Sequence, residues 1–253
     1  MDAREQFGRT AAAYVDSPVH AAGRTLARCR ELAGLRGGER VLDVGTGAGH
    51  LAFALASLAG EVVALDLTPA MLEVAAYEAR RRGIGNVSFV QGDALDLPFP
   101  EGGFQAVLCR VAAHHFPDPA RAVAEMARVV ELGGLVLVAD TCVPEDDGLD
   151  RRINELELLR DASHRRNWRP GEWRGFFRRA GLTVQGQEWG FLEREMPLEE
   201  WLERAATPPE RQAAVRRCFA EADAALRAAL AVREEAGQWY FQLPWVITWG
   251  RRP

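Results

Sequence analysis

Apolar runs and helix-like segments alternate along residues 40–139, and this alternation limits the possible folds more strongly than any other feature of the sequence. The runs are rich in Val, Leu and Ile and almost uniformly apolar, which is typical of parallel strands buried on both faces. Strand–helix units that repeat in this way predict a doubly wound α/β sheet with right-handed crossovers. We expect strands at 40–44, 61–66, 86–91, 104–109 and 135–139, and helices at 51–59, 69–82 and 119–130.

The pattern becomes less regular after residue 140. All seven tryptophans lie beyond residue 167. They could form a pocket for a flat substrate, but we favour ordinary packing, because buried aromatic side chains are common in protein cores. We expect helices at 144–164 and 171–180, a helical region rich in Ala, Glu, Arg and Leu at 198–236, and late strands at 182–190 and 238–249.

Composition removes several classes of function. The formal net charge of −5 argues against a nucleic-acid partner. The sequence contains no lysine, which excludes Schiff-base chemistry and P-loop nucleotide hydrolysis. The four cysteines form no C-x-x-C pair, so we expect no metal site. The charged start and the lack of a long apolar run predict a cytoplasmic protein without membrane insertion.

A glycine-rich turn, VLDVGTGAGH at residues 41–50, joins the first expected strand to the helix that follows it. Glycine permits positive φ angles and lets a ligand approach the backbone closely. The start of the next helix provides free N–H groups with a partial positive charge, which suits a carboxylate or a phosphate. The turn therefore indicates a nucleotide-like ligand, but it does not identify that ligand by itself.

The spacing and charge of this turn disfavour a dinucleotide. A dinucleotide fingerprint needs glycine at the sixth position counted from Gly45, and that position is His50. Asp43 would repel a pyrophosphate, whereas it would attract the α-ammonium group of a methionine moiety. These features favour S-adenosylmethionine (SAM).

Two further carboxylates follow the next two expected strands. Asp66 ends the second strand, where it can accept hydrogen bonds from both hydroxyls of a ribose. Asp93 follows the third strand and can accept one from an adenine amine. The carboxyl ends of parallel strands line a common ligand crevice, so we expect Asp43, Asp66 and Asp93 to face one cavity.

Taken in order, these motifs resemble those of the class I SAM-dependent methyltransferases. VLDVGTGAGHLA is similar to their first motif, VVALDLTPAML to the acidic motif of the second strand, and VQGDALDLPFPEGGFQAVLCRVAAHHFPDP to the third and fourth motifs. EMARVVELGGLVLVAD and GEWRGFFRRAGL resemble later motifs. The resemblance covers roughly residues 38–190 and is greatest to the small-molecule branch that includes the quinone-biosynthesis C-methyltransferases.

The resemblance implies a Rossmann-like, mostly parallel sheet of seven strands with an antiparallel last strand. It also implies helical additions at both ends of a single methyltransferase domain. The expected parts are an N-terminal helical lid at 1–37, a SAM-binding core at 38–190, a helical insertion at 191–237 and a final strand at 238–253.

The resemblance further implies which residues bind SAM. The glycine-rich turn is assigned to the methionine end, the second strand end to the ribose, and the third to the adenine. Two residues after the fourth strand flank the methionine portion. The full predicted set is Asp43, Gly45, Thr46, Gly47, Asp66, Leu67, Asp93, Ala94, Arg110 and Val111.

Few catalytic side chains are needed, because methyl transfer from a sulfonium is an in-line displacement that alignment in a dry pocket can promote. If the acceptor is a hydroxyl or an activated carbon, a base can assist, and His114 and His115 are the best candidates. A histidine at this edge can equally form part of the cavity wall. Phe7, Tyr14 and His20, on the expected lid, are weaker candidates.

The acceptor is the least determined part of the prediction. The fourth strand ends in CRVAAHH, without the Asn/Asp-Pro-Pro-aromatic tetrapeptide typical of methyltransferases that act on amino groups of nucleobases or glutamine. The arginines of residues 165–169 could clamp an anionic acceptor, but we favour a solvated helix face. We therefore expect a small-molecule acceptor, aromatic or isoprenoid-like.

Two alternatives differ in class from this methyltransferase. One is a non-catalytic module that only binds SAM, which nothing in the sequence excludes. The other is a nicotinamide-dependent oxidoreductase, which His50 and Asp43 disfavour. The sequence leaves the oligomeric state open, and a homodimer is one option.

Overall fold

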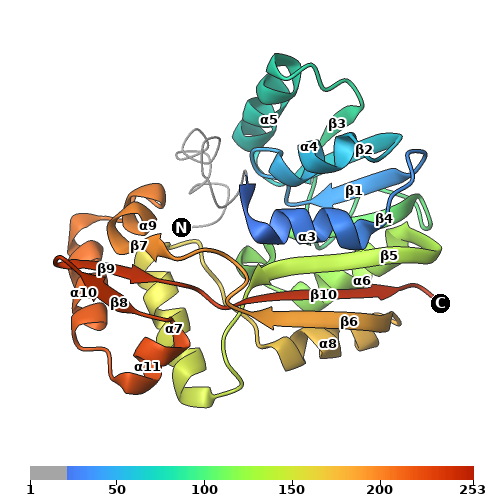
Figure 1. Ribbon diagram of the computed structural model, residues 1–253. Coiled ribbons are helices and arrows are strands. Elements are labelled where there is room, and N and C mark those ends of the chain that lie inside the picture. Colours follow the sequence, from blue (N-terminus) through green and yellow to red (C-terminus); the bar gives the residue numbers. More distant parts are fainter. Residues whose placement is uncertain (1–21) are drawn as a thin grey trace.

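A seven-stranded sheet forms the centre of the computed structural model, which describes residues 22–253 (Figure 1). The spatial order of the strands is β3-β2-β1-β4-β5-β10-β6. Strands β1 to β5 pair in parallel, and β10 lies antiparallel between β5 and β6. The predicted fold class is therefore confirmed. The strands are β1 Arg40–Val44, β2 Glu61–Asp66, β3 Val87–Gln91, β4 Phe104–Arg110, β5 Val130–Thr141, β6 Thr183–Gly190 and β10 Trp245–Arg251.

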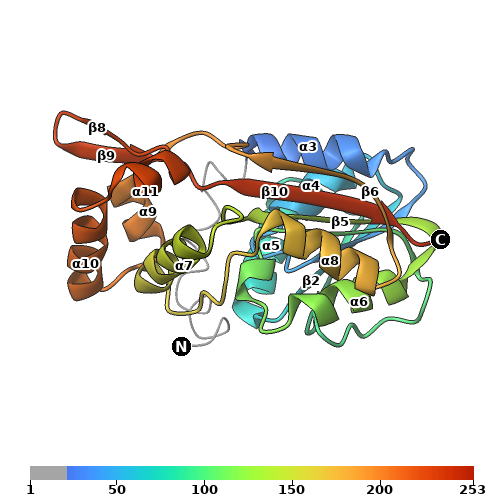
Figure 2. The same cartoon turned by 90° about the horizontal axis from the view of Figure 1, so that it is seen from below.

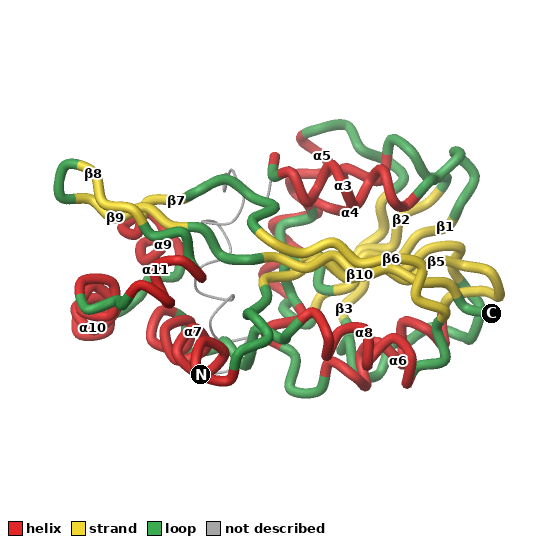
Figure 3. Tube along the Cα trace, turned by 60° about the horizontal axis from the view of Figure 1, so that its bottom comes forward, coloured by secondary structure: helices red, strands yellow, loops and turns green. Residues whose placement is uncertain are grey.

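Helices cover both faces of this sheet, as Figure 3 shows. Helices α3 (Arg24–Ala33), α4 (His50–Ala56) and α5 (Pro69–Arg81) lie on one face, and α6 (Pro119–Val129) and α8 (Pro170–Arg179) lie on the other. The inward side chains form separate apolar clusters on the two faces. This double burial explains why the strands read as uniformly apolar runs.

Local sequence sets where several helices begin. Pro69 occupies the first turn of α5, where its missing N–H costs no hydrogen bond. The carboxylate of Asp118 accepts a hydrogen bond from the backbone N–H of Arg121 and so caps α6. Most expected boundaries agree within two residues, but α4 ends three residues early and β5 is longer than expected, at Val130–Thr141.

A further apolar cluster lies beyond the carboxyl ends of the parallel strands, and we call the elements around it the cap. Its core includes Leu156, Trp201, Phe219 and Phe241. Figures 1 and 2 show the cap at one end of the sheet. Its elements are α7 Asp147–Arg160, β7 Met196–Pro197, α9 Leu198–Arg204, α10 Pro209–Ala220, α11 Ala224–Ala229, β8 Arg233–Glu235 and β9 Gln238–Phe241.

The cap corrects two expectations about the late chain. The expected helical region at 198–236 ends in strand β8, because Ala236 and Gly237 both adopt positive φ angles and form a two-residue hairpin with β9. The expected single strand at 238–249 is two strands in different sheets. Pro244, which has no N–H to donate, lies directly before β10.

The buried carboxylate of Glu193 ties the start of the cap to α3. It accepts hydrogen bonds from the backbone N–H groups of Arg24 (2.9 Å) and Thr25 (2.8 Å) and from the hydroxyl of Thr25 (2.5 Å). The guanidinium of Arg110 lies 3.7 Å away. The N-cap residue of α3 is Gly23, which has no capping side chain, so Glu193 supplies the cap from the far end of the sequence.

No helix within residues 22–253 combines the length and the apolar character needed to cross a bilayer.

We expect Glu193→Ala to lower the free energy of unfolding by about 3 kcal/mol, because it removes the partner of a buried guanidinium and the acceptor for two helix N–H groups. Urea denaturation measures this change. Glu195→Ala is the matched control, since Glu195 pairs with Arg233 on the surface and its loss should cost about 1 kcal/mol or less. Equal losses for the two variants would contradict the anchoring role of Glu193.

Candidate functional site

A cavity lies between the carboxyl ends of the parallel strands and the cap. One wall comes from the loops after β1, β2 and β4, and the other from α7, α9 and the segments that flank β9. Of the predicted cofactor and catalytic residues, those that line it are Asp43, Gly45, Thr46, Gly47, Asp66, Arg110, Val111, His114 and His115.

The glycine-rich turn needs glycine for two different reasons. Gly45, Gly47 and Gly49 have φ angles of 70°, 53° and 89°, in the left-handed region that favours glycine. A Cβ atom on Gly45 would lie 2.5 Å from the Cβ of Ala112, so the loops after β1 and β4 meet too closely for any side chain. A Cβ atom on Gly47 would have nothing within 4 Å, which leaves room for a ligand beside the backbone.

Asp43 is almost fully buried and pins this turn. One carboxylate oxygen, Oδ2, accepts hydrogen bonds from the hydroxyl of Thr46 (2.7 Å) and the backbone N–H of Ala52 (3.0 Å). Within residues 22–253, Oδ1 accepts none, so it is available to a cationic ligand. Burial raises the pKa of Asp43 to about 7, against the opposing effect of these hydrogen bonds. The N–H groups expected to be free at the start of α4 are therefore partly used by Asp43.

Asp66 lies at the end of β2 with 9 % of its surface exposed. Its two oxygens accept hydrogen bonds from the backbone N–H groups of Gly47 (2.8 Å) and Thr68 (2.9 Å). Burial raises its pKa, and the hydrogen bonds act in the opposite direction. A carboxylate has about four acceptor positions, so Asp66 can still accept from ribose hydroxyls.

The structure does not bring every predicted cofactor residue to this cavity. Leu67, Asp93 and Ala94 are outside its lining. The Asp93 carboxylate accepts a hydrogen bond from the backbone N–H of Leu95 (2.9 Å) in the exposed turn after β3, and Ala94 packs in the core. Asp43 and Asp66 thus share the cavity while Asp93 lies outside its lining, and the predicted contact of Asp93 with adenine stays a prediction.

The loop after β4 contains a strained residue. Val111 has a φ angle of +57°, which is rare for a β-branched side chain, and its backbone N–H is held by the carbonyl of Ala139 on β5 (2.9 Å). The preceding residue, Arg110, is buried and donates to the hydroxyl of Thr25 (3.1 Å). Burial lowers the pKa of Arg110.

His114 is held by the buried carboxylate of Asp140 at the end of β5. The Nδ1 atom lies 2.6 Å from one carboxylate oxygen, and the backbone N–H of His114 donates to the other (2.9 Å). Burial alone would lower the pKa of His114, but the attraction and hydrogen bond of Asp140 outweigh it and raise the pKa. The ring nitrogen Nε2 has no hydrogen bond among the described residues.

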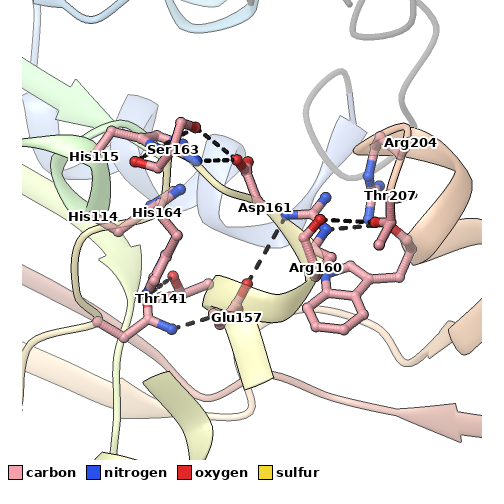
Figure 4. Close-up of polar contacts among 12 residues, drawn as sticks. His114, His115, Thr141, Glu157, Arg160, Asp161, Ser163, His164, Arg204 and Thr207 are labelled. Carbon is pink, nitrogen blue, oxygen red and sulfur yellow. Dashed lines mark hydrogen bonds and ion pairs between the residues drawn. The ribbon is translucent and has the colours of Figure 1, made fainter. Parts of the chain in front are cut away.

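Two neighbouring histidines have a different character. The rings of His115 and His164 lie 4.1 Å and 5.7 Å from that of His114 (Figure 4). Burial lowers the pKa of His115, and the adjacent His114 lowers it further. Burial also lowers the pKa of His164 to about 2. The lowered pKa of His115, which lines the cavity, suits a wall better than a base that must accept a proton, and His164 is outside the lining.

The cap supplies the lining residues that sequence reasoning missed. Charged side chains come from the end of α7 and from α9, and they carry no local signal because only tertiary packing brings these helices to the strand ends. Of the seven tryptophans, Trp201 and Trp245 reach the cavity. The lining residues from the cap and the adjoining segments are Glu157, Arg160, Asp161, Met196, Trp201, Arg204, Leu243 and Trp245.

The arginines of residues 165–169 do not line the cavity. They lie in the segment between α7 and α8 rather than on a helix face, which corrects our expectation. Arg166 and Arg169 form ion pairs with Asp150, at 2.7 Å and 2.8 Å. Phe7, Tyr14 and His20 are outside the described residues.

Comparison with known proteins agrees with the SAM site that was expected from the sequence and that this geometry fits. A methyltransferase domain family matches residues 42–138. YcgJ of Bacillus subtilis, an uncharacterized methyltransferase, is 40% identical over 207 residues, which cover 81% of each chain. Its crystal structure matches with a TM-score of 0.84 at 34% identity, covering 90% of this chain and 97% of that one.

Two more distant proteins that match this chain are also methyltransferases. The demethylmenaquinone methyltransferase of Thermus thermophilus is 40% identical over 115 residues, which span 45% of this chain and 52% of that relative. A geranyl diphosphate methyltransferase crystallised with SAM has the same fold, with a TM-score of 0.66 at 19% identity over 90% of this chain and 84% of that one.

The fold, the glycine-rich turn and the carboxylates at the strand ends define a SAM-binding α/β transferase. With these comparisons, the chain belongs to the class I SAM-dependent methyltransferases, and SAM is its cofactor. The open space beside Gly47 and the available acceptor positions on Asp43 and Asp66 fit that cofactor.

We expect Asp66→Ala to weaken SAM binding by about 100-fold or more, because it removes an acceptor for ribose hydroxyls and the partner of Gly47. Isothermal titration calorimetry measures the affinity. Asp96→Ala, an exposed residue of the loop after β3, is the control and should bind SAM as the wild type does. Undiminished affinity in a folded Asp66→Ala protein would refute the assignment of Asp66 to the cofactor.

Proposed function

We propose that this methyltransferase transfers a methyl group to a small-molecule acceptor held between the strand ends and the cap, with His114 as the general base. The observation that carries the proposal is the pairing of His114 with buried Asp140 on the same cavity as Asp43 and Asp66. SAM, when bound, supplies an electrophilic methyl group on a sulfonium. The protein therefore needs mainly to align the acceptor, exclude water and remove a proton.

In this proposal the strand-end wall holds the cofactor. Asp43 attracts the α-ammonium group, and Asp66 accepts from the ribose hydroxyls. Other predicted contacts complete the set: Gly45, Thr46 and Gly47 at the methionine end, Leu67 beside the ribose, Asp93 and Ala94 at the adenine, and Arg110 and Val111 beside the methionine portion.

The cap wall supports an acceptor with an aromatic or isoprenoid-like body. Met196, Trp201, Leu243 and Trp245 present apolar surface to the cavity. Such surface binds a flat or branched hydrocarbon by excluding water. The partial match to a demethylmenaquinone methyltransferase is consistent with a small-molecule acceptor.

His114 can act as a base because Asp140 fixes its ring. Nδ1–H donates to Asp140, which leaves the Nε2 lone pair for the proton of an acceptor hydroxyl or activated carbon. As the methyl group moves to the acceptor, that proton moves to Nε2, and the Asp140 carboxylate stabilises the imidazolium that forms. His115, whose pKa is lowered, serves as a wall.

The first test is incubation of the protein with SAM and a bacterial metabolite extract, followed by measurement of S-adenosylhomocysteine. We expect S-adenosylhomocysteine to accumulate only when the extract is present, because an acceptor is required. A protein that binds SAM but forms no S-adenosylhomocysteine with any extract would be a binding module and not the enzyme proposed here.

The second test is the pH dependence of kcat, measured with the isolated acceptor from about pH 5.5 to 9. The base must be neutral, so kcat should rise with pH through the pKa of His114, which Asp140 raises. Asp140→Asn removes the charge that favours the imidazolium, so the inflection should move to lower pH. His114→Asn should lower kcat by about 100-fold to 10,000-fold.

His115→Asn is the matched variant and should leave the inflection where it is. A pH profile of His114→Asn that keeps the wild-type inflection and rate would assign the base to another residue.

A further inference from the structure

The cap wall contains a nearly buried guanidinium whose terminal nitrogens lack a hydrogen-bond acceptor. The side chain of Arg160, in the last turn of α7, is 11% exposed and lines the cavity. Among the described residues, neither Nη1 nor Nη2 makes a hydrogen bond, and the ion pair of Nη1 with Glu157 has a separation of 4.0 Å. Because Arg160 lines the cavity and its two terminal nitrogens have no hydrogen bond among the described residues, both can donate to an acceptor that arrives with a ligand.

Contacts that do not use the hydrogen atoms of its terminal nitrogens hold the side chain of Arg160 in place. Its Nε atom donates to the carbonyl of Trp201 (3.2 Å), and the guanidinium lies over the ring of Trp201 at 5.0 Å from the ring centre. The carbonyl of Arg160 accepts a hydrogen bond from the hydroxyl of Thr207 (2.8 Å). Figure 4 shows Arg160 beside Thr207. The guanidinium is therefore positioned before a ligand binds, which reduces the entropy cost of binding.

The neighbouring carboxylates are engaged elsewhere. One oxygen of Asp161 accepts from both the backbone N–H (2.8 Å) and the hydroxyl (2.7 Å) of Ser163. The side-chain amide of Asn167 donates a hydrogen bond to Glu157 at 3.5 Å, and burial raises the pKa of Glu157. Neither acid is within hydrogen-bond distance of the terminal nitrogens of Arg160.

The cavity that Arg160 lines also has apolar lining residues and a second arginine. Trp201 and Trp245 both line it. Arg204, on α9, adds a second cation to the lining. Met196 and Leu243 are apolar. A ligand that complements both the arginines and the apolar residues of this wall has anionic oxygen atoms at one end and hydrocarbon next to them.

We propose that the methyl acceptor carries an anionic oxygen group, a carboxylate or a phosphate, that accepts paired hydrogen bonds from Nη1 and Nη2 of Arg160. The planar guanidinium matches either group in a bidentate arrangement. The hydrocarbon part of the acceptor packs against Trp201, Met196 and Leu243. This inference rests on the proposed function and narrows its acceptor, because a neutral quinol would leave the guanidinium without an acceptor.

The first experiment identifies the product. The protein is incubated with SAM that carries a deuterated methyl group and with a bacterial metabolite extract, and labelled products are found by mass spectrometry. We expect the product to bind an anion-exchange resin at neutral pH, and its elemental composition distinguishes a phosphate from a carboxylate. A labelled product that is neutral at this pH overturns the inference but leaves the proposed function intact. No labelled product from any extract overturns both.

The second experiment assigns the anion to Arg160. With the isolated acceptor, Arg160→Gln should raise KM by about 10-fold to 100-fold, the loss typical of a paired hydrogen bond to a charged group. Arg160→Lys keeps the positive charge but cannot donate two parallel hydrogen bonds from one planar group. Its KM should therefore lie between those of the wild type and Arg160→Gln. The affinity for SAM should not change in either variant.

Arg217→Gln, an exposed arginine of α10, is the matched control and should keep the wild-type KM. An unchanged KM in folded Arg160→Gln would overturn the inference. A fall in SAM affinity without a change in KM would also overturn it, because Arg160 would then bind the carboxylate of SAM. A methyl ester or dephosphorylated form of the acceptor should bind equally weakly to wild type and Arg160→Gln.

Discussion

Buried carboxylates at the ends of the parallel strands are the interaction on which the rest of the site depends. Both faces of the sheet are covered, so polar groups concentrate where the strands end, and a buried carboxylate there needs hydrogen-bond donors. Asp43, Asp66 and Asp140 obtain these donors from backbone N–H groups at and beyond the strand ends: Ala52 for the first, Gly47 and Thr68 for the second, His114 and Thr141 for the third. The same three acids therefore shape the loops that form the cavity.

Both the sheet and the strand-end wall of the cavity could be predicted from the sequence, because each depends on local patterns. Apolar runs predicted β1 and β2 without error and β3 and β4 to within one residue, whereas β5 begins at Val130, before its expected start at residue 135. The spacing from Gly45 to His50 excluded a dinucleotide. Asp43 and Asp66 reach the cavity because a residue that ends a parallel strand faces the same edge of the sheet as its neighbours.

The rest of the site could not be predicted, because it depends on contacts between distant segments. Arg160 belongs to a stretch that reads as a charged helix, and only the packing of α7 beside α9 brings it to the cavity. Asp140 directly follows the fifth expected strand, but the sequence offers no reason to single it out, because its pairing with His114 requires β4 and β5 to be neighbours. The hairpin of β8 and β9 was hidden by a helix-forming composition, since the left-handed conformation of Ala236 has no signature in the sequence.

The anchoring of Glu193 on α3 has a mechanical consequence for the cap. That carboxylate is held by the backbone of α3, so the chain that leads into β7 is fixed to the sheet layer where the cap begins. Cys142, which follows β5, and Pro244, which precedes β10, are joined by a hydrogen bond from the N–H of Cys142 to the carbonyl of Pro244. The crossing after α7 donates two backbone N–H groups, from Arg165 and Arg166, to the carbonyl of His114. The segment that follows α7 is thus hydrogen-bonded through its backbone to the residue that carries the proposed catalytic imidazole, so the cap wall and the position of His114 are built on one continuous stretch of main-chain contacts.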